Sequence, residues 1–372
     1  MKITICLLLL LFTTSIYAQK DTVKIKQKPK VTFDGAMETY YSYDLNQPTD
    51  GDRPSFIYSH SRHNEFNVNL AMVRASVASK WYRGSVGFGA GSFMQYNMSH
   101  EPAWLRYIYE AQVGIRIVKG LWLDAGIFPS HLGFESAIGS DNWTLTRSLV
   151  TESAPYYLAG AKLTYTTPND QWSFAGIVCN GWQNIAENNA LKAGGLQVVY
   201  KPTDKITINY SNYIGDENPD TTEVYLLRFF NNLYGTMEFG EHFKLATGVD
   251  FGIEQSLVAS DSVFNGNQVT VTKQYAWFSW VAPVVIAQYS FNDKWQIAGR
   301  VEYFLDYNAM IMEHERSEIF GYSLNVDFSP VKYTKIRLEG RFMHSIVPVF
   351  EYPNNLLSNQ NFAITASASV RF

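Results

Sequence analysis

The sequence lacks the residues and patterns on which most enzyme assignments depend. It has two cysteines in 372 residues, and Cys6 lies in the apolar N-terminal stretch. The remaining Cys179 cannot form a disulfide framework alone, and we interpret it as a small buried or lipid-facing side chain. We find no glycine-rich phosphate loop and no Cys/His spacing typical of a metal site. The sequence therefore predicts no cofactor, no metal and no catalytic residue.

Charge and long apolar runs are also scarce. Only 17% of the residues are charged, and the net charge of −4 argues against a nucleic-acid partner. Beyond the first residues, no apolar run approaches the roughly 20 residues of a membrane-spanning helix. Aromatic residues nevertheless make up 15% of the chain, and the mean hydropathy is −0.15. A membrane β-barrel is expected to combine these properties, because only alternate residues face lipid and aromatic girdles mark both interfaces.

The N-terminus resembles an export signal. Met1-Lys2 is followed by the apolar run from Ile3 to Phe12 and by Thr13-Thr14-Ser15-Ile16-Tyr17-Ala18, which offers a cleavage site before Gln19. This run is too short to span a bilayer and predicts a signal peptide at 1–18 that is removed on export. Residues 19–31 are polar and lysine-rich, which indicates a short periplasmic lead-in. We assign 32–372 to the barrel.

The C-terminal stretch has a strict period of two. From Phe362 to Phe372, every second residue is apolar, and polar or small residues stand between them. A lone amphipathic strand would leave a hydrogen-bonding edge that invites aggregation. We expect this strand to close a membrane barrel by pairing with the first strand, with Phe372 as the barrel-closing terminus. A terminal aromatic strand resembles those that the barrel-assembly machinery recognises.

The rest of the chain predicts an all-β, closed antiparallel transmembrane barrel of about 16 strands, with 14–18 as the range. Turn residues form short connections that alternate with long ones, as in outer-membrane barrels with short periplasmic turns and long extracellular loops. The expected strands cover 33–44, 65–79, 84–96, 107–117, 121–128, 157–166, 172–179, 192–200, 205–215, 223–239, 243–254, 276–291, 295–307, 319–328, 334–344 and 361–372.

Alternation within these strands predicts which charges enter the lumen. In 334–344, the apolar Ile336 and Leu338 alternate with Arg337 and Glu339. Charges on the lipid face cost several kcal/mol, so they are expected inside a wet lumen. The lumen wall is predicted to carry Lys244, Asp250, Glu254 and Asp327, and the charges nearest a constriction are Arg300, Glu302, Arg337, Glu339 and Arg341.

The connection 129–156 is the longest and is unusually apolar for an exposed loop. Its apolar residues need burial, and Gly87, Gly89 and Gly91 on one face of 84–96 indicate room inside the barrel. We therefore expect this loop to fold into the lumen as a pore constriction, where mixed charges create a transverse field that favours polar solutes. An alternative is a loop that folds over the barrel mouth for stability alone. The loop residues of the predicted constriction are His131, Glu135, Asp141, Arg147 and Glu152.

Several segments resemble the OmpL-like β-barrel porins of Bacteroidota. The similar segments are 33–44, 59–67, 101–111, 123–136 and 180–183, which include Glu101-Pro102-Ala103-Trp104 and Asn180-Gly181-Trp182-Gln183. The resemblance runs over nearly the whole mature chain. It implies an outer-membrane barrel of a Gram-negative bacterium with passive pore activity, and it supplies no substrate and no catalytic residues.

Three functions are compatible with these sequence features. We favour a channel for passive diffusion of small polar solutes, with outer-membrane lipid and the assembly machinery as partners and a homo-oligomer as one option. A non-conducting structural or adhesion barrel is the alternative, because the sequence does not reveal whether the lumen is open. A barrel-embedded hydrolase is less favoured, since neighbouring His344 and Ser345 on a strand point to opposite faces.

Overall fold

The computed structural model describes residues 28–219, 224–265, 268–312 and 317–372. The signal peptide predicted at 1–18 and most of the lead-in predicted at 19–31 lie outside these residues. Among the helices within them, none has the length and apolarity needed to cross a membrane.

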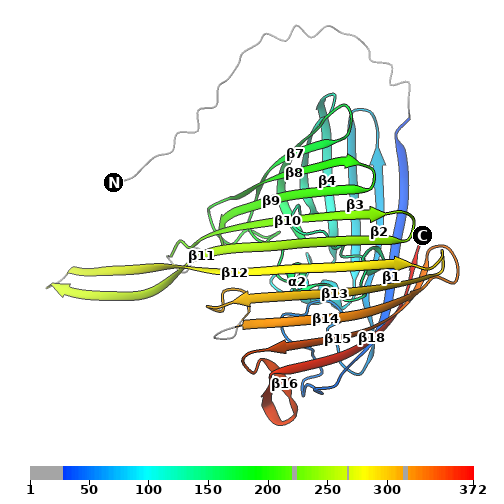
Figure 1. The fold of residues 1–372 in the computed structure, drawn as a ribbon. Helices are drawn as coiled ribbons and strands as arrows, with labels where there is room; N and C mark the ends of the chain where they lie inside the picture. Colours follow the sequence, from blue (N-terminus) through cyan, green and yellow to red (C-terminus); the bar gives the residue numbers. More distant parts are fainter. Residues whose placement is uncertain (1–27, 220–223, 266–267, 313–316) are drawn as a thin grey trace, which may run out of the picture.

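Within the described residues, sixteen strands form one closed antiparallel barrel, which confirms the predicted fold class (Figure 1). Each strand pairs with its neighbours in the sequence, and β1 and the last strand meet. The barrel strands are β1 Lys30–Asp44, β2 Phe66–Ala78, β3 Tyr82–Ala90, β4 Ile108–Val118, β5 Leu121–Pro129, β6 Tyr157–Thr166, β7 Trp172–Cys179, β8 Ala193–Thr203, β9 Ile206–Asp216, β10 Leu227–Phe239, β11 Phe243–Asn265, β12 Gln268–Ser290, β13 Trp295–Asp306, β14 Ser317–Phe328, β15 Thr334–Ser345 and β18 Gln360–Arg371.

Small elements occupy the long connections. They are the helices α1 Ser92–Asn97 and α2 Leu149–Glu152, the 3-10 turns η1 Gly139–Asp141 and η3 Pro353–Asn355, and the hairpin of β16 Phe350–Tyr352 with β17 Leu356–Ser358. Short and long connections alternate as predicted except between β11 and β12, where strand runs to Asn265 and resumes at Gln268. Both ends of the barrel sheet lie at the short-turn end.

The first and last strands close the barrel. Their register runs from Ala36 opposite Arg371 to Asp44 opposite Ala363. The backbone bonds continue to Phe372, whose carbonyl accepts from the Gly35 amide at 3.0 Å. Because every barrel strand is paired on both sides, no unpaired backbone edge faces the hydrocarbon.

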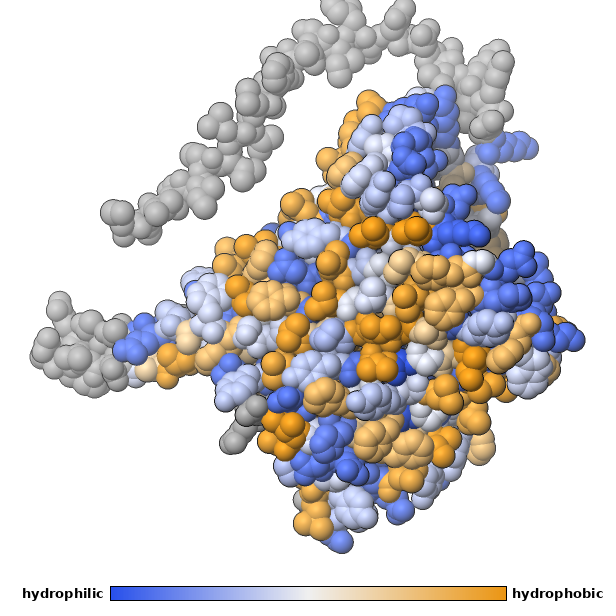
Figure 2. All heavy atoms as spheres, viewed as in Figure 1, coloured by the Kyte–Doolittle hydropathy of each residue, from blue (hydrophilic) through white to orange (hydrophobic). Residues whose placement is uncertain are grey.

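Alternation along the strands sorts residues between lipid and lumen. In β15, Ile336 and Leu338 are about half exposed, whereas Arg337 and Glu339 are 1% exposed. Figure 2 shows apolar side chains over the middle of the wall and hydrophilic ones gathered at the short-turn end (right). Exposed aromatic residues mark that end as a membrane interface: Trp81, Tyr82, Tyr165, Trp172, Phe239, Tyr289, Trp295 and Tyr333.

An irregularity in β2 aims Arg74 inward. The pairing of β1 with β2 shifts between Glu38 and Thr39, so that Asn69 is an extra residue in β2. A β-bulge of this kind reverses the alternation beyond it. Arg74 then points inward and pairs with Asp34 at 2.8 Å. The apolar alternation of 65–79 breaks phase near Ala71-Met72, and a bulge is therefore needed for Arg74 to face inward.

Two predicted elements are wrong. The strand expected at 84–96 ends at Ala90, because Gly91 has φ 124° and its Cβ would lie 2.5 Å from the Asn69 carbonyl oxygen. The chain then forms α1, and the space beside Gly89 is filled by Met94 of that helix rather than by the loop after β5. The connection predicted at 255–275 is instead largely strand, since β11 and β12 pair from Phe243 to Asn265 and extend beyond the barrel (Figure 1).

Candidate functional site: the barrel lumen

The buried face of β13, β14 and β15 carries a set of six charged residues, here called the charged cluster. Each is at most 2% exposed. Within it, Arg341 Nη2 lies 2.6 Å from Glu302 Oε1, and Arg300 Nη2 lies 3.1 Å from Glu339 Oε1. Buried charges must be paired in this way, because an isolated ion is strongly disfavoured away from water. The cluster comprises Arg300, Glu302, Asp327, Arg337, Glu339 and Arg341.

Arg337 joins this wall to the connection between β5 and β6, here called loop 130–156. Its guanidinium donates to the carbonyl oxygens of Gly139 at 2.9 Å, Asn142 at 3.1 Å and Trp143 at 3.0 Å. It also pairs with Asp327 through Nε at 2.8 Å and Nη2 at 3.1 Å. One planar fork therefore fixes a carboxylate of the wall and three loop carbonyls together.

Two glutamates of the cluster accept bonds from loop amides. Glu339 accepts from the Thr146 amide at 2.6 Å and from its hydroxyl at 2.8 Å. Glu302 accepts from the Leu149 amide at 2.7 Å. Hydrogen bonds to ionised acceptors are stronger than neutral ones, so the start of α2 is held against β13 and β15.

The same loop also contacts the opposite wall. His131 Nε2 donates to the Asn212 carbonyl oxygen of β9 at 2.8 Å, and the Gly133 amide donates to Asn232 Oδ1 of β10 at 3.1 Å. Burial lowers the pKa of His131 to about 4, so its ring is neutral at pH 7. The chain of loop 130–156 therefore runs from β8–β10 across to β13–β15.

Two further charged residues order the loop internally. Glu135 accepts from the Thr151 hydroxyl at 2.7 Å and from the Ser148 amide at 3.0 Å. Arg147 is 1% exposed, donates to the Ser136 carbonyl oxygen at 3.0 Å and lies over the Tyr156 ring at 4.8 Å. These contacts make the loop a packed unit with its own hydrogen-bond network.

Glu152, the last residue of α2, is the most perturbed acid of the loop. Burial raises its pKa to about 7, and the Arg147 charge opposes this only in part. Its Oε2 accepts from the Tyr58 amide at 3.1 Å. Glu152 therefore titrates near neutral pH at a contact between two loops.

The connection between β1 and β2, residues 45–65, is part of the site although the sequence analysis did not identify it. Ile57 is 2% exposed, and the Phe56 ring lies 6.2 Å from that of Phe350. His60 Nε2 lies 3.3 Å from Glu38 Oε2 on β1. The available signal was the apolar pair Phe56-Ile57 in an otherwise polar loop, which needs burial for the same reason as loop 130–156.

The remaining predicted residues lie apart from the charged cluster. Asp141 forms an ion pair with Arg371 near the short-turn end. The predicted wall residues are each paired with a neighbouring strand: Lys244 with Glu238 at 2.7 Å, Asp250 with Asn232 at 2.5 Å and Glu254 with Arg228 at 2.6 Å.

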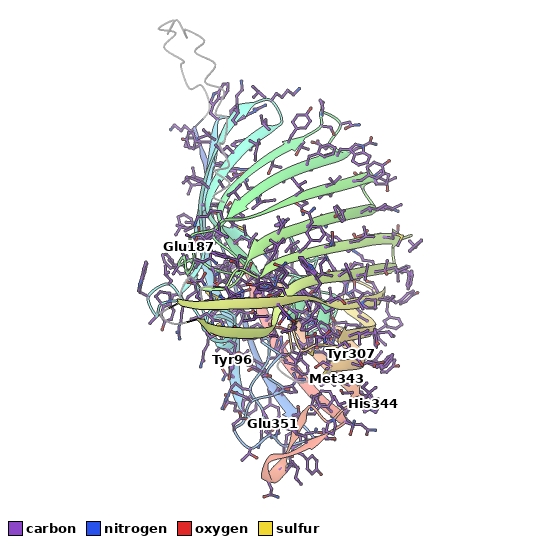
Figure 3. All side chains as sticks on the ribbon, turned by 90° about the vertical axis from the view of Figure 1, so that its left-hand side faces the viewer. Tyr96, Glu187, Tyr307, Met343, His344 and Glu351 are labelled. Atoms are coloured by element: carbon purple, nitrogen blue, oxygen red, sulfur yellow. The ribbon has the colours of Figure 1, made fainter. Side chains whose placement is uncertain are left out.

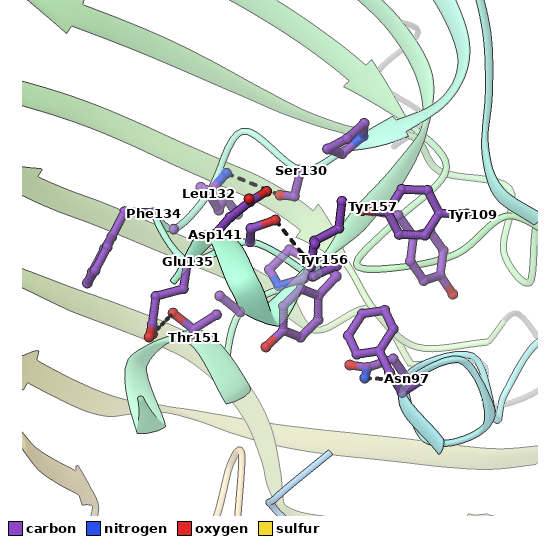
Figure 4. A pocket seen from close by; sticks show the side chains of 18 of the residues that line it. Asn97, Tyr109, Ser130, Leu132, Phe134, Glu135, Asp141, Thr151, Tyr156 and Tyr157 are labelled. Atoms are coloured by element: carbon purple, nitrogen blue, oxygen red, sulfur yellow. Dashed lines mark hydrogen bonds between the residues drawn. The ribbon is translucent and has the colours of Figure 1, made fainter. Parts of the chain in front are cut away.

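Two cavities lie beside loop 130–156. The first, of about 340 Å³, is lined by polar groups and by aromatic rings. Figure 4 shows Asn97, Tyr109, Tyr156 and Tyr157 on one side of it, with Phe134 and Glu135 further along. The second, of about 390 Å³, is lined by residues of several loops at the other end, among them Tyr96, Trp182, Glu217 and Arg228. Figure 3 views that loop end, where Tyr96 and Glu187 are labelled.

A nucleophilic site on the barrel wall would need a serine and a histidine that face the same side. His344, labelled in Figure 3, and Ser345 are successive residues of β15. Only Ser345 is fully buried, so the two side chains face opposite sides of the wall. No group of three His, Cys, Asp or Glu side chains in this part of the chain could hold a metal ion. The described lumen residues present ion pairs, amides and aromatic rings.

Comparison with known proteins identifies the family. The family described as "Putative beta-barrel porin-2, OmpL-like" matches residues 30–372. The chain belongs to this β-barrel porin family. A search of curated proteins gives no match.

Solved structures share the fold at low sequence identity. The chain is similar to the outer-membrane channel DcaP of Acinetobacter baumannii, with TM-score 0.61, 9% identity and coverage of 93% of this chain and 98% of that one. It is similar to an anion-selective porin from Comamonas acidovorans, with TM-score 0.56, 8% identity and coverage of 93% and 100%. The trimer form of OmpT of Vibrio cholerae gives TM-score 0.56, 11% identity and coverage of 93% and 100%. At this identity, the likeness concerns the fold.

Proposed function

We propose that this protein is an outer-membrane diffusion pore for small polar solutes, narrowed by loop 130–156. The observation that supports this most is a closed barrel of the porin family whose lumen side contacts one long loop on two opposite walls. A wall with an apolar outer face and a charged inner face suits a hydrated passage through lipid.

In this proposal the charged cluster acts through the loop. The sequence predicted that Arg300, Glu302, Arg337, Glu339 and Arg341 face a water-filled gap and set up a transverse field. Since these groups are buried and bonded to one another and to the loop, we propose that they fix the position of the constriction. Their assignment to the constriction itself, with that of His131, Glu135, Asp141, Arg147 and Glu152, stays a prediction.

The experiment that tests this proposal is single-channel recording on the refolded protein and on a deletion of 132–150. We expect discrete conductance steps for the intact chain and larger steps for the deletion, because the loop then no longer narrows the lumen. Equal conductance of the two proteins would reject the constriction role. Liposome swelling with sugars of graded size would set the size cutoff.

A second candidate is a non-conducting structural barrel. It is favoured by the density of contacts between loop 130–156 and both walls, and by the burial of all members of the charged cluster. Absence of any conductance from a correctly folded barrel would support this candidate over the pore.

Biogenesis and assembly belong to the same proposal. We propose export by a signal peptide at 1–18, a periplasmic lead-in at 19–31, and recognition of the β18 strand with Phe372 by the barrel-assembly machinery. A homo-oligomer is proposed by analogy with the trimer form of OmpT, and chemical crosslinking in membranes would test it. The origin in Bacteroidota also stays a prediction.

A further inference from the structure

The two cavities beside loop 130–156 lie toward opposite ends of the barrel. The 340 Å³ cavity, here called the turn-side cavity, includes Arg74, Asp141 and Arg371 in its lining. Arg371 ends β18 and pairs with Asp141, and Arg74 pairs with Asp34 near the start of β1, so this cavity faces the short-turn end. The 390 Å³ cavity, here called the loop-side cavity, is lined by Tyr96 and Asn188 from the long connections.

The cavities have three lining residues in common, Asn97, Ala154 and Tyr157. Asn97 ends α1, Ala154 follows α2 and Tyr157 begins β6. Their exposed fractions are only 5%, 6% and 7%. They therefore form a thin partition between two water-accessible spaces, and its two sides come from different connections of the barrel.

Hydrogen bonds hold both sides of this partition. Asn97 Nδ2 donates to the Phe93 carbonyl oxygen at 3.0 Å, and Gln183 Nε2 donates to the Asn97 carbonyl oxygen at 2.8 Å. The Tyr157 hydroxyl donates to Glu101 Oε1 at 3.0 Å. None of the three partition residues carries a charge, whereas charged side chains line both cavities.

The opposite side of loop 130–156 has a different character. There the charged cluster binds loop carbonyls and amides directly, and Leu145 is fully buried with its amide on Asn325 Oδ1 at 3.1 Å. A cavity of about 110 Å³ lies between Trp143 and Ile286, and none of its lining residues lines the loop-side cavity. A solute on that side would have to break ion pairs and backbone bonds to pass.

We infer that solutes cross the lumen between α1 and the 154–157 end of loop 130–156, through the partition of Asn97, Ala154 and Tyr157, and not between the loop and β13–β15. This inference rests on the proposed diffusion function. Because the partition is uncharged and offers an amide and a phenol ring, the permeant class is small uncharged polar molecules, selected by size and hydrogen bonding.

Three variants test the route in planar bilayers and in liposome swelling with arabinose and with a disaccharide. Tyr157→Ala removes the ring from the partition, and conductance and disaccharide entry should rise at least about twofold. Ala154→Trp fills the partition, and conductance should fall at least about twofold. Leu145→Ala, a truncation in the same loop on the charged-cluster side, tests the other route and should raise conductance less than Tyr157→Ala does. The matched control is Leu338→Ala, a truncation on the exposed outer face of β15, which should conduct like wild type.

The outcomes separate the route from the proposed function. Wild-type protein that folds but passes neither ions nor arabinose overturns the diffusion function and the route with it. The route alone is overturned if wild type conducts and the conductance of Tyr157→Ala and Ala154→Trp equals that of wild type. It is also overturned if conductance rises more in Leu145→Ala than in Tyr157→Ala. Heat-modifiable migration on gels tests whether each variant folds. If Tyr157→Ala fails to fold, the comparison of conductance between Ala154→Trp and Leu145→Ala decides whether the route is correct.

Discussion

Replacing Arg337 with alanine should release loop 130–156 from β15 without opening the barrel. The guanidinium makes three bonds to loop carbonyls and two to Asp327, and the side chain is 1% exposed. The strand pairing of β15 with β14 and β18 uses backbone groups only, so it is retained. The variant therefore loses the bonds that hold the loop and the ion pair of Asp327, whose remaining cation is Lys335 at 3.6 Å.

Removing one partner of a buried ion pair typically costs about 3–5 kcal/mol. If this cost is expressed as local opening of the loop, the open population rises more than about 100-fold. Arg337→Lys keeps the charge but loses the planar fork, so its effect should be intermediate. The loop amides of Leu145, Thr146 and Leu149, which bond to wall side chains, are the reporters.

Hydrogen exchange of the refolded barrel in detergent micelles measures this opening. Peptides covering 139–149 should exchange much faster in Arg337→Ala, while peptides of β13 and β14 should keep their wild-type rates. Arg83→Ala is the control, because Arg83 on β3 pairs at 2.6 Å with Asp124 on β5 and not with loop 130–156. Equal exchange of 139–149 in wild type and Arg337→Ala would refute the role of the charged cluster as the anchor of the loop.

Three further predictions concern single side chains. Burial raises the pKa of Glu152 to about 7 from 4.5, so its contribution to stability is complete below pH 4.5 and is lost as pH rises through 7. Glu152→Gln should abolish this pH dependence of the urea-unfolding midpoint, and an unchanged pH dependence would contradict the prediction. Burial lowers the pKa of His131 to about 4 from 6.5, so its contribution to stability is present above pH 6.5 and is lost as pH falls through 4. His131→Asn should remove this loss of stability in acid, and a variant as acid-sensitive as wild type would contradict the prediction. A Cβ at Gly252 would overlap the Trp280 ring, so Gly252→Val should destabilise the barrel by about 1–3 kcal/mol. The control is Gly240→Val, at a turn glycine with open space but φ 66°, which reports the backbone cost alone. Equal losses of stability in the two variants would contradict the packing argument.

The wall could be predicted from the sequence because its rule is local. In β15, a period of two places Arg337 and Glu339 on one face and Ile336 and Leu338 on the other, and lipid outside enforces that choice. The same reasoning gave the strand number and the pairing of β1 with β18.

The interior could be predicted only in part. Apolar residues in loop 130–156 indicated burial, but the acceptors of Arg337 are backbone carbonyls, which no residue type reveals. The strand expected at 84–96 was wrong because the turn at Gly91 depends on its contact with Asn69, a residue of another strand. The long hairpin of β11 and β12 was missed because its outer part extends beyond the other strands (Figure 1), where contact with lipid does not enforce the apolar alternation.

The central claim is that this barrel encloses a hydrated path across the outer membrane. Its most direct test is planar-bilayer recording of the refolded chain 19–372, with folding checked on the same sample. We predict discrete, reproducible conductance steps at fixed voltage. A fully folded barrel that inserts into the bilayer and never conducts would contradict the claim and leave a structural barrel.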